Sequence, residues 1–256
     1  MLIVLGLAAC AAPDVYDETR GWTVEKLYAE ARDEVDSGNY TRAEKLYETL
    51  EARFPYGRYA QQAQMDLAYT YYKDNEPELA IAAADRFIKL HPTHPNVDYV
   101  YYLKGLVYYS EDTGFLARFG GQDMSERDSK SAHEAFAAFR EVSTRFPNSR
   151  YTPSARAKMK ELVDRLGGHE MHVARYYMLR GAYIAAVNRA QVVVTQYNNT
   201  RYVDEALAIM ATGYDRLGMA QLRDDTQRVL ALNYPDSTYL RTPWQAVNTP
   251  WWKFWK

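Results

Sequence analysis

The chain has 256 residues, of which 47% are hydrophobic and 25% are charged, so it is long and apolar enough to bury a core. Its formal net charge of −2 argues against a nucleic-acid-binding protein, because such proteins collect an excess of Lys and Arg on one face. The single cysteine excludes a framework of disulfides within the chain, so stability has to come from packed secondary structure.

The first nine residues form a short apolar run that ends in small side chains directly before Cys10. The run is too short for a transmembrane helix, and residues 7–10 look like the lipobox of a bacterial lipoprotein signal peptide. We predict that residues 1–9 are the remnant of a signal peptide, that Cys10 carries lipid and that residues 10–22 form a flexible linker. Ala11 replaces the Asp that retains many lipoproteins at the inner membrane, so the predicted location is the periplasmic face of the outer membrane. The alternative for a lone cysteine is a buried structural thiol.

Further along, the chain repeats a short phrase. Residues 53–59 read Arg-Phe-Pro-Tyr-Gly-Arg-Tyr, residues 145–151 read Arg-Phe-Pro-Asn-Ser-Arg-Tyr, and weaker copies lie at residues 196–202 and 233–239. Internal repetition with a period between about 20 and 50 residues is typical of units that cannot bury their apolar face alone and must stack on their neighbours.

The prolines of these phrases give the period. Pro55 and Pro92 are 37 residues apart, and so are Pro235 and Asn198, which replaces the proline of its copy. The middle intervals, from Pro92 to Pro147 and from Pro147 to Asn198, are 55 and 51 residues and so exceed the period by 18 and 14 residues. The repeat array therefore contains two insertions.

Upstream of each phrase the residues fit the tetratricopeptide pattern, in which small residues at matched positions let two helices approach and aromatic residues fill the space between units. With 23 copies, tyrosine is the main filler, and we interpret most repeat tyrosines as packing residues. The positions that fit are Leu27, Ala31, Gly38, Tyr40, Ala43 and Tyr47 in repeat one; Leu67, Ala68, Tyr71, Ala80 and Phe87 in repeat two; Tyr101, Gly105, Tyr108, Ala135 and Phe139 in repeat three; Ala174, Tyr177, Gly181, Tyr183, Ala186 and Val193 in repeat four; and Leu207, Ala211, Tyr214, Gly218 and Leu230 in repeat five.

We therefore predict an all-α fold, a right-handed superhelical solenoid of about five tetratricopeptide repeats. Residues 23–152 form repeats one to three, and residues 153–240 form repeats four and five with an extra helical segment. That segment runs from Pro153 to Leu166, and we expect Gly167-Gly168 to end or kink it. Solenoid surfaces of this kind hold other polypeptides, so the fold predicts binding rather than chemistry.

No catalytic constellation is apparent in the sequence, which lacks a phosphate-binding glycine loop and a nucleophile elbow. His91 and His94 flank a proline in a predicted turn, where local spacing supplies no further metal ligands. His169 and His172 are three residues apart, which is not the spacing of a zinc-binding HExxH helix. We predict no enzyme activity, no metal and no cofactor.

Two segments lie outside the repeat pattern. The insertion at residues 111–128 suits a flexible loop that contacts a partner, and equally a cover folded over the concave face. The tail at residues 241–256 combines Trp and Phe with Lys, which suits the membrane interface or a hydrophobic slot on a partner. Packing on repeat five as a cap is the equally weighted alternative for the tail. Its aromatic residues are Trp244, Trp251, Trp252, Phe254 and Trp255.

The combination of a lipobox, five repeats and irregular insertions resembles the BamD (ComL) family over roughly residues 7–240. The segments that carry the resemblance are Gln61–Leu67, Tyr71–Lys73, Asp85–Ile88, His91–Asn96, Asp98–Val100, Arg127–Asp128, Phe146–Ser149, Arg180–Tyr183 and Val187–Arg189. The resemblance implies membership of the β-barrel assembly machinery of the outer membrane, in which the family docks on the periplasmic domains of the barrel protein BamA. The other partners that it implies are further assembly lipoproteins and unfolded outer-membrane β-barrel proteins.

The resemblance also implies a division of labour between the repeats. Repeats one to three would receive the targeting signal of unfolded outer-membrane proteins, in a groove lined by Tyr69, Tyr72, Tyr99 and Tyr102. Repeats four and five would face BamA through Asn188 and Arg189, because a guanidinium group suits planar contacts with carboxylates and carbonyls. The alternative for Arg189, given equal weight with the BamA contact, is that it lies on a solvated helix face or forms an ion pair within the chain.

Two other functions compete with this interpretation. One is a periplasmic tetratricopeptide scaffold that coordinates cell-wall synthesis with envelope constriction, and the other is a hydrolase hidden in a helical array. The lipobox and the irregular insertions favour the assembly lipoprotein over the first, and the missing catalytic residues disfavour the second.

Overall fold

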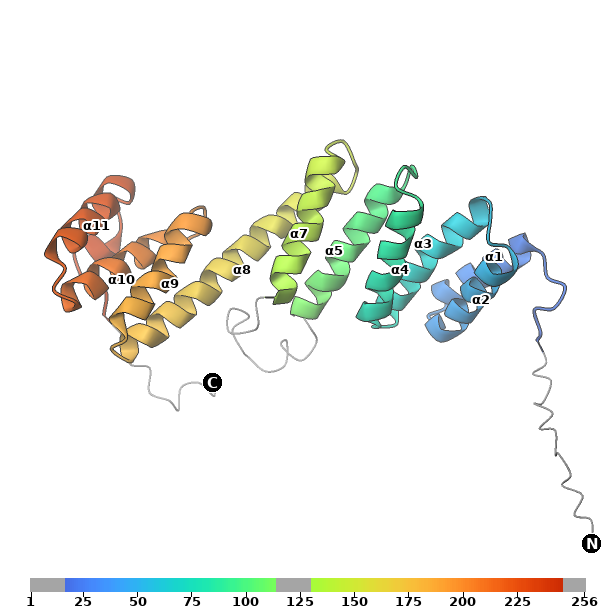
Figure 1. The fold of residues 1–256 in the computed structure, drawn as a ribbon, viewed down its shortest axis with the longest axis horizontal. Helices are drawn as coiled ribbons and strands as arrows, with labels where there is room; N and C mark the ends of the chain where they lie inside the picture. Colours follow the sequence, from blue (N-terminus) through green and yellow to red (C-terminus); the bar gives the residue numbers. More distant parts are fainter. Residues whose placement is uncertain (1–16, 114–129, 246–256) are drawn as a thin grey trace, which may run out of the picture. The chain divides into compact units, whose positions relative to one another are not determined.

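The computed structural model describes residues 17–113 and 130–245, and within these residues it is helical and contains no strand (Figure 1). The predicted all-α class is confirmed. In chain order the elements are α1 (Val24–Asp36), α2 (Tyr40–Arg53), α3 (Arg58–Lys73), α4 (Pro77–Leu90), α5 (Val97–Thr113), α7 (Lys130–Arg145), α8 (Thr152–Leu179), α9 (Tyr183–Gln196), α10 (Val203–Arg216), α11 (Ala220–Asn233) and the short 3₁₀ helix η2 (Thr238–Leu240).

Between Asp74 and Asn75 the chain divides into two compact units. In the first unit, α1 packs on α2 and α2 packs on α3. In the second unit, contacts run in chain order from α4 to α5, α7, α8, α9, α10 and α11. Packing of each helix on the next one along the chain is the arrangement of a helical repeat solenoid, as the sequence predicts. The handedness of the superhelix stays a prediction.

The turns inside the helix pairs depend on residues that tolerate a left-handed backbone. Gly38, Gly181 and Gly218 have φ values of 80°, 71° and 73°, which favour glycine because it has no Cβ. Repeat two has no glycine at this place, and Asn75 adopts the conformation with φ 63°. Asparagine tolerates this region better than other residues with a side chain, so the turn is kept despite the substitution.

Most of the predicted repeat positions lie in the core, whereas Gly38, Gly181 and Gly218 are exposed and several of the repeat tyrosines are half-buried. In repeat one the completely buried positions are Leu27, Ala31, Ala43 and Tyr47. Repeats two to four bury further positions just as completely: Ala68, Ala80, Phe87, Ala135, Phe139, Ala174, Ala186 and Val193. Gly105 lets α5 approach α7, because a Cβ at this position would lie 2.5 Å from the Phe139 ring. Small residues therefore set the spacing between helices, and aromatic residues fill what remains.

Of the two outcomes predicted for Gly167-Gly168, an end or a kink of the helical segment, the end is wrong. Gly167-Gly168 does not end the extra helical segment, since α8 continues as a single helix of 28 residues from Thr152 to Leu179. Both glycines are buried, and a Cβ on Gly167 would lie 3.3 Å from the Thr200 side chain and 3.4 Å from Cβ of Tyr197. Gly167 therefore allows the turn between α9 and α10 to pack closely on α8, and this contact outweighs its low helix propensity.

The C-terminal end of the predicted linker contacts α2. Thr19 is buried, and the guanidinium group of Arg53 in α2 donates to the Thr19 carbonyl at 2.7 Å and pairs with the Asp17 carboxylate. Asp17 and Thr19 are therefore joined to α2, and the flexibility of residues 10–22 stays a prediction. Cys10, residues 114–129 of the insertion and residues 246–256 of the tail lie outside the described residues, so the predictions made for them stay predictions.

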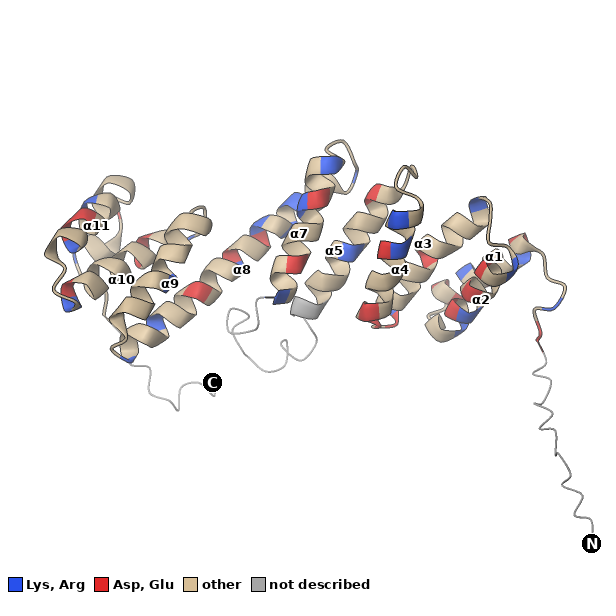
Figure 2. Cartoon of the chain, viewed as in Figure 1, with Lys and Arg blue, Asp and Glu red and all other residues tan. Residues whose placement is uncertain are grey.

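Charged residues of both signs mix along the helices instead of collecting in separate blocks, as Figure 2 shows for α8. Among residues 17–113 and 130–245, the helices lack the combination of length and hydropathy that a bilayer-spanning segment requires.

Candidate interaction surfaces

Tyr69 and Tyr72, two of the tyrosines predicted to line a client groove, lie on α3 in the first unit. Their ring centroids are 6.4 Å apart, and both side chains are partly exposed. The neighbouring Tyr71 is buried and donates from its hydroxyl to Oε1 of Glu48 in α2 at 2.9 Å. The helix therefore buries Tyr71 as a packing residue and leaves Tyr69 and Tyr72 partly accessible.

Tyr99 and Tyr102 lie on α5 in the second unit and meet at a third ring that the sequence analysis did not single out. The ring of Tyr151, just before α8, stacks on Tyr102 at 5.0 Å and lies 5.5 Å from Tyr99. The Tyr102 hydroxyl also hydrogen-bonds the Ser154 hydroxyl at 2.8 Å. Tyr151 ends the repeated phrase Arg-Phe-Pro-Asn-Ser-Arg-Tyr, and this position was the available signal for its role.

Cations border the same aromatic surface. The Arg150 guanidinium lies 4.8 Å from the centroid of the Tyr151 ring, and the Lys158 ammonium lies 4.0 Å from the centroid of Tyr109. Tyr109 also donates from its hydroxyl to Oε1 of Glu161 at 2.6 Å. The surface formed by α5 and the first half of α8 thus offers ring faces, cations and hydrogen-bonding groups together, which are the groups that recognise an extended polypeptide. Because Tyr69 and Tyr72 belong to the other compact unit, one groove built from all four predicted tyrosines stays a prediction.

The described part of the first unit also contains an open pocket of about 860 Å³. Its walls come from residues 17–19 and from α2, and the charged groups among them are Asp17, Glu18, Arg42, Lys45 and Glu48. Arg42 is paired with Glu34 at 2.6 Å. Tyr69 and Tyr72 do not line this pocket, so it is separate from the predicted tyrosine surface.

Asn188 and Arg189 are exposed on α9. The Arg189 guanidinium forms an ion pair with Oε2 of Glu170 in α8 at 3.1 Å, while 46% of the arginine side chain remains exposed. The alternative of an ion pair within the chain is thus present in the structure. Since Arg has five N–H donors, the pair with Glu170 leaves donors for a second contact.

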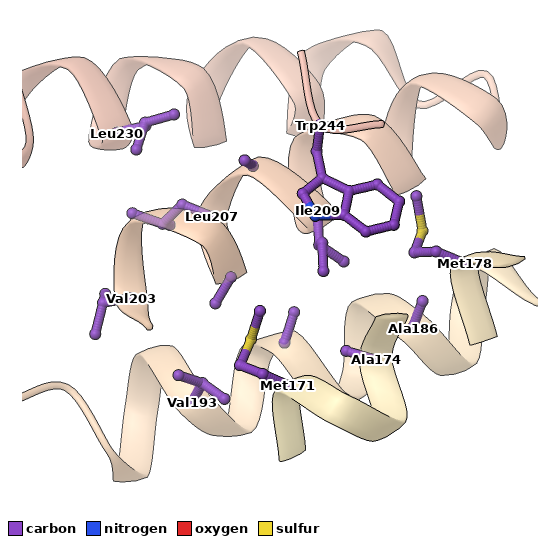
Figure 3. Close-up of a cluster of buried hydrophobic side chains, with 13 residues drawn as sticks. Met171, Ala174, Met178, Ala186, Val193, Val203, Leu207, Ile209, Leu230 and Trp244 are labelled. Carbon is purple, nitrogen blue, oxygen red and sulfur yellow. The ribbon is translucent and has the colours of Figure 1, made fainter. Parts of the chain in front are cut away.

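Trp244, in the described part of the tail, packs on repeats four and five. The indole is only 8% exposed and belongs to a buried cluster that includes Met171, Met178 and Ile209 (Figure 3). The indole N–H donates to Oε1 of Glu205 at 3.0 Å. For Trp244 the structure therefore favours the alternative that the tail packs on the repeats.

Glu205 also binds Arg175 of α8 through two parallel hydrogen bonds, of 2.7 Å from Nε and 2.6 Å from Nη2. Burial alone would raise the pKa of Glu205, but the hydrogen bonds from Arg175 and Trp244 outweigh burial and hold that pKa below its usual range. The carboxylate therefore stays ionised and joins α8, α10 and the tail.

A second polar cluster lies inside repeats one and two. The Asp66 carboxylate on α3 accepts hydrogen bonds from the Tyr28 hydroxyl at 2.7 Å and from Nε2 of Gln62 at 3.0 Å. Burial raises the pKa of Asp66, and burial likewise raises the pKa of Tyr28 to about 12. The cluster joins α1 to α3 and contributes to packing.

Comparison with known proteins identifies the family. The model named YfiO, described as an outer membrane lipoprotein, matches residues 21–230. An outer membrane protein assembly factor BamD from Neisseria meningitidis serogroup B is 56% identical over 255 residues, which covers 98% of this chain and 96% of the relative. The chain belongs to the BamD family. The likeness extends beyond residues 7–240, the range expected from the sequence alone.

More distant BamD proteins match most of the chain as well. The BamD of Xylella fastidiosa (strain 9a5c) is 38% identical and covers 88% of this chain and 77% of the relative, and the BamD of Vibrio cholerae is 34% identical and covers 87% and 91%. Among solved structures, one of a putative kinesin light chain with tetratricopeptide-like repeats covers 84% of this chain and 97% of that chain, with a TM-score of 0.38 and 18% identity. A structural likeness this low carries no argument, so the sequence relatives alone decide the family.

Proposed function

We propose that the chain is a lipid-anchored scaffold of the outer-membrane β-barrel assembly machinery, which binds BamA and the targeting signal of unfolded outer-membrane proteins. The observation that carries this proposal is the 56% identity, over 98% of the chain, to a protein named outer membrane protein assembly factor BamD. The helical repeat fold supports a scaffold, because stacked repeats present extended surfaces to other chains.

Client binding is assigned to the tyrosine surfaces of repeats one to three. Tyr99 and Tyr102 contact the Tyr151 ring next to Arg150, which supports recognition of apolar side chains by the rings and of carbonyl or carboxylate groups by the cation. Tyr69 and Tyr72 supply a second pair of partly exposed rings. Affinity for each client is modest in this account, because ordering a disordered segment offsets part of the contact energy.

Docking on BamA is assigned to repeats four and five through Asn188 and Arg189. The partial exposure of Arg189 supports this role, and its ion pair with Glu170 orients the guanidinium before a partner arrives. Other assembly lipoproteins are the further partners in this account.

Anchoring to the periplasmic face of the outer membrane is assigned to Cys10. The lipobox supports this role, and two or more acyl chains on one cysteine hold a protein stably on a bilayer, whereas one chain binds reversibly. Replacing Cys10 by Ala is expected to move the protein from the membrane fraction to the soluble fraction, apart from the part that partners retain. A Cys10→Ala variant that fractionates like the parent after partners are removed by high salt would contradict lipid anchoring.

The experiment that tests the function is co-purification. Extracted in mild detergent, the chain is expected to bring down a BamA-like barrel protein together with unfolded outer-membrane proteins. Recovery of cell-wall synthesis enzymes without any barrel protein would instead support the alternative, a periplasmic scaffold that coordinates cell-wall synthesis with envelope constriction.

A further inference from the structure

Repeats four and five already hold one segment of polypeptide, the chain's own tail. After η2 the chain runs without regular helix to Trp244, whose indole enters the cluster of Met171, Met178 and Ile209 (Figure 3). The indole N–H meets the Glu205 carboxylate at 3.0 Å. We call the place defined by Arg175, Met178, Glu205 and Ile209 the indole site.

The indole site combines the two features that recognise a tryptophan in an extended chain. Met178 and Ile209 provide apolar contacts for the ring, and Glu205 provides an ionised acceptor for the N–H group. Arg175 holds the acceptor in place through its two hydrogen bonds. The residues that define the site therefore all come from α8 and α10.

Within residues 240–245, the part of the tail that the structure describes here, a single side chain is buried at this site. Leu240 is 39% exposed, and residues 241–243 and Gln245 are exposed as well, so Trp244 is the buried residue of this stretch. Ordering several residues to bury one indole leaves little net free energy, because the entropy lost along the backbone is comparable to the gain from one side chain. Segments of this kind open locally at low cost.

We propose that the indole site is a recognition site for an extended, tryptophan-bearing segment of another polypeptide, and that Pro243-Trp244 is a built-in occupant that such a segment displaces. Displacement exchanges one indole for another, so the bond to Glu205 and the contacts with Met178 and Ile209 are kept. The proposal concerns a surface separate from Asn188 and Arg189, and it stands or falls independently of the assembly function.

The test is binding of a labelled peptide with the sequence of residues 241–250, which contains Trp244, to the lipidated full chain in detergent and to a variant that ends at Thr242. We expect the shortened variant to bind the peptide at least tenfold more tightly, because in the full chain the tethered tail competes at an effective concentration of roughly millimolar. Equal affinity of the two proteins for the peptide would overturn the proposal, since it would place the peptide elsewhere.

Two matched peptides test the chemistry without changing the protein. Replacing the tryptophan by alanine is expected to abolish binding to the shortened variant, and replacing it by 1-methyltryptophan, which lacks the N–H group, is expected to weaken binding about fivefold to tenfold. Unchanged affinity of both peptides would refute recognition at the indole site. If the shortened variant loses its helical circular dichroism, the full-length Trp244→Ala variant takes its place, and there too peptide binding no tighter than that of the parent chain overturns the proposal.

Discussion

The Ser237 hydroxyl donates a hydrogen bond to Oδ2 of Asp204 at 3.0 Å, and the same bond recurs 2.5 Å long between Ser149 and Asp98. In each pair the aspartate begins the first helix of a repeat, and the serine lies in the turn after the second helix. The other carboxylate oxygen of each aspartate accepts the backbone N–H of the next residue at 2.8 Å. The bond therefore closes the helix pair, and it explains the serine that two of the four copies of the phrase share.

Removing this closure is expected to destabilise repeat five. Ser237→Ala leaves Oδ2 of Asp204 without its donor, so the free energy of unfolding should fall by about 1 kcal/mol. Urea unfolding followed by circular dichroism measures the change. Thr238→Ala, at an exposed neighbouring position, is the control and should stay within about 0.5 kcal/mol of the parent. Equal effects of the two substitutions would show that the bond contributes nothing.

Gly213 on α10 tests the close approach of helices. A Cβ at this position would lie 2.5 Å from Cγ2 of Val187 in α9, so Gly213→Ala is expected to lower the free energy of unfolding by about 1–3 kcal/mol. Gly167→Ala is the comparison. Its Cβ would lie 3.3 Å from the nearest atoms, so the gain in helix propensity is expected to cancel the strain and to leave the free energy of unfolding nearly unchanged. Adding Val187→Ala should recover part of the Gly213→Ala loss, and strict additivity of the two losses would contradict this explanation.

Asp66 predicts a pH dependence of stability. Its folded pKa lies above the usual value of 3.8, so this carboxyl stabilises the fold fully below pH 3.8, and its contribution is lost as the pH rises through the folded pKa. In the parent chain this loss lowers the free energy of unfolding as the pH rises above 3.8. Asp66→Asn should therefore make that decline smaller. Urea unfolding at a series of pH values measures it, and parallel curves for variant and parent would contradict the prediction.

Glu205 predicts a pH dependence of stability opposite to that of Asp66. Its folded pKa lies below the usual 4.5, so its stabilisation is present above pH 4.5 and is lost as the pH falls through the folded pKa. Glu205→Gln should remove this acid-side loss of unfolding free energy while lowering stability at neutral pH, because Arg175 loses its partner. Urea unfolding at a series of pH values measures both effects, and a pH dependence of the variant identical to that of the parent would count against the role of Glu205.

Arg189 has two assignments that a pair of variants separates. If it contacts BamA, Arg189→Ala should weaken recovery of BamA about tenfold, whereas Glu170→Gln, which removes the charge of its ion-pair partner and keeps the arginine, should leave recovery nearly unchanged. If the arginine only stabilises the chain, both variants should lower the free energy of unfolding similarly and neither should alter recovery. Quantitative co-purification together with urea unfolding distinguishes the two outcomes.

The parts of the fold that follow from local chemistry were predictable from the sequence. The burial of Leu27 and Phe139 follows from repeat spacing, and the turn at Gly38 follows from the need for a left-handed backbone. Gly167 was mispredicted because the rule that glycine ends helices is local, whereas the packing of Thr200 on α8 comes from a residue 33 positions away. Tyr151 was missed for the same reason, since its contacts with α5 join residues about 50 positions apart.

The most direct test of the assembly function is photocrosslinking from single exposed positions in the chain. A benzophenone probe at Asn188 on α9 should capture the BamA-like barrel protein, and a probe at Ser154, beside the Tyr102 and Tyr151 rings, should capture unfolded outer-membrane proteins. Gln227, exposed on α11, serves as the control position. Capture of neither partner above the Gln227 background, or capture of cell-wall enzymes alone, would contradict the account.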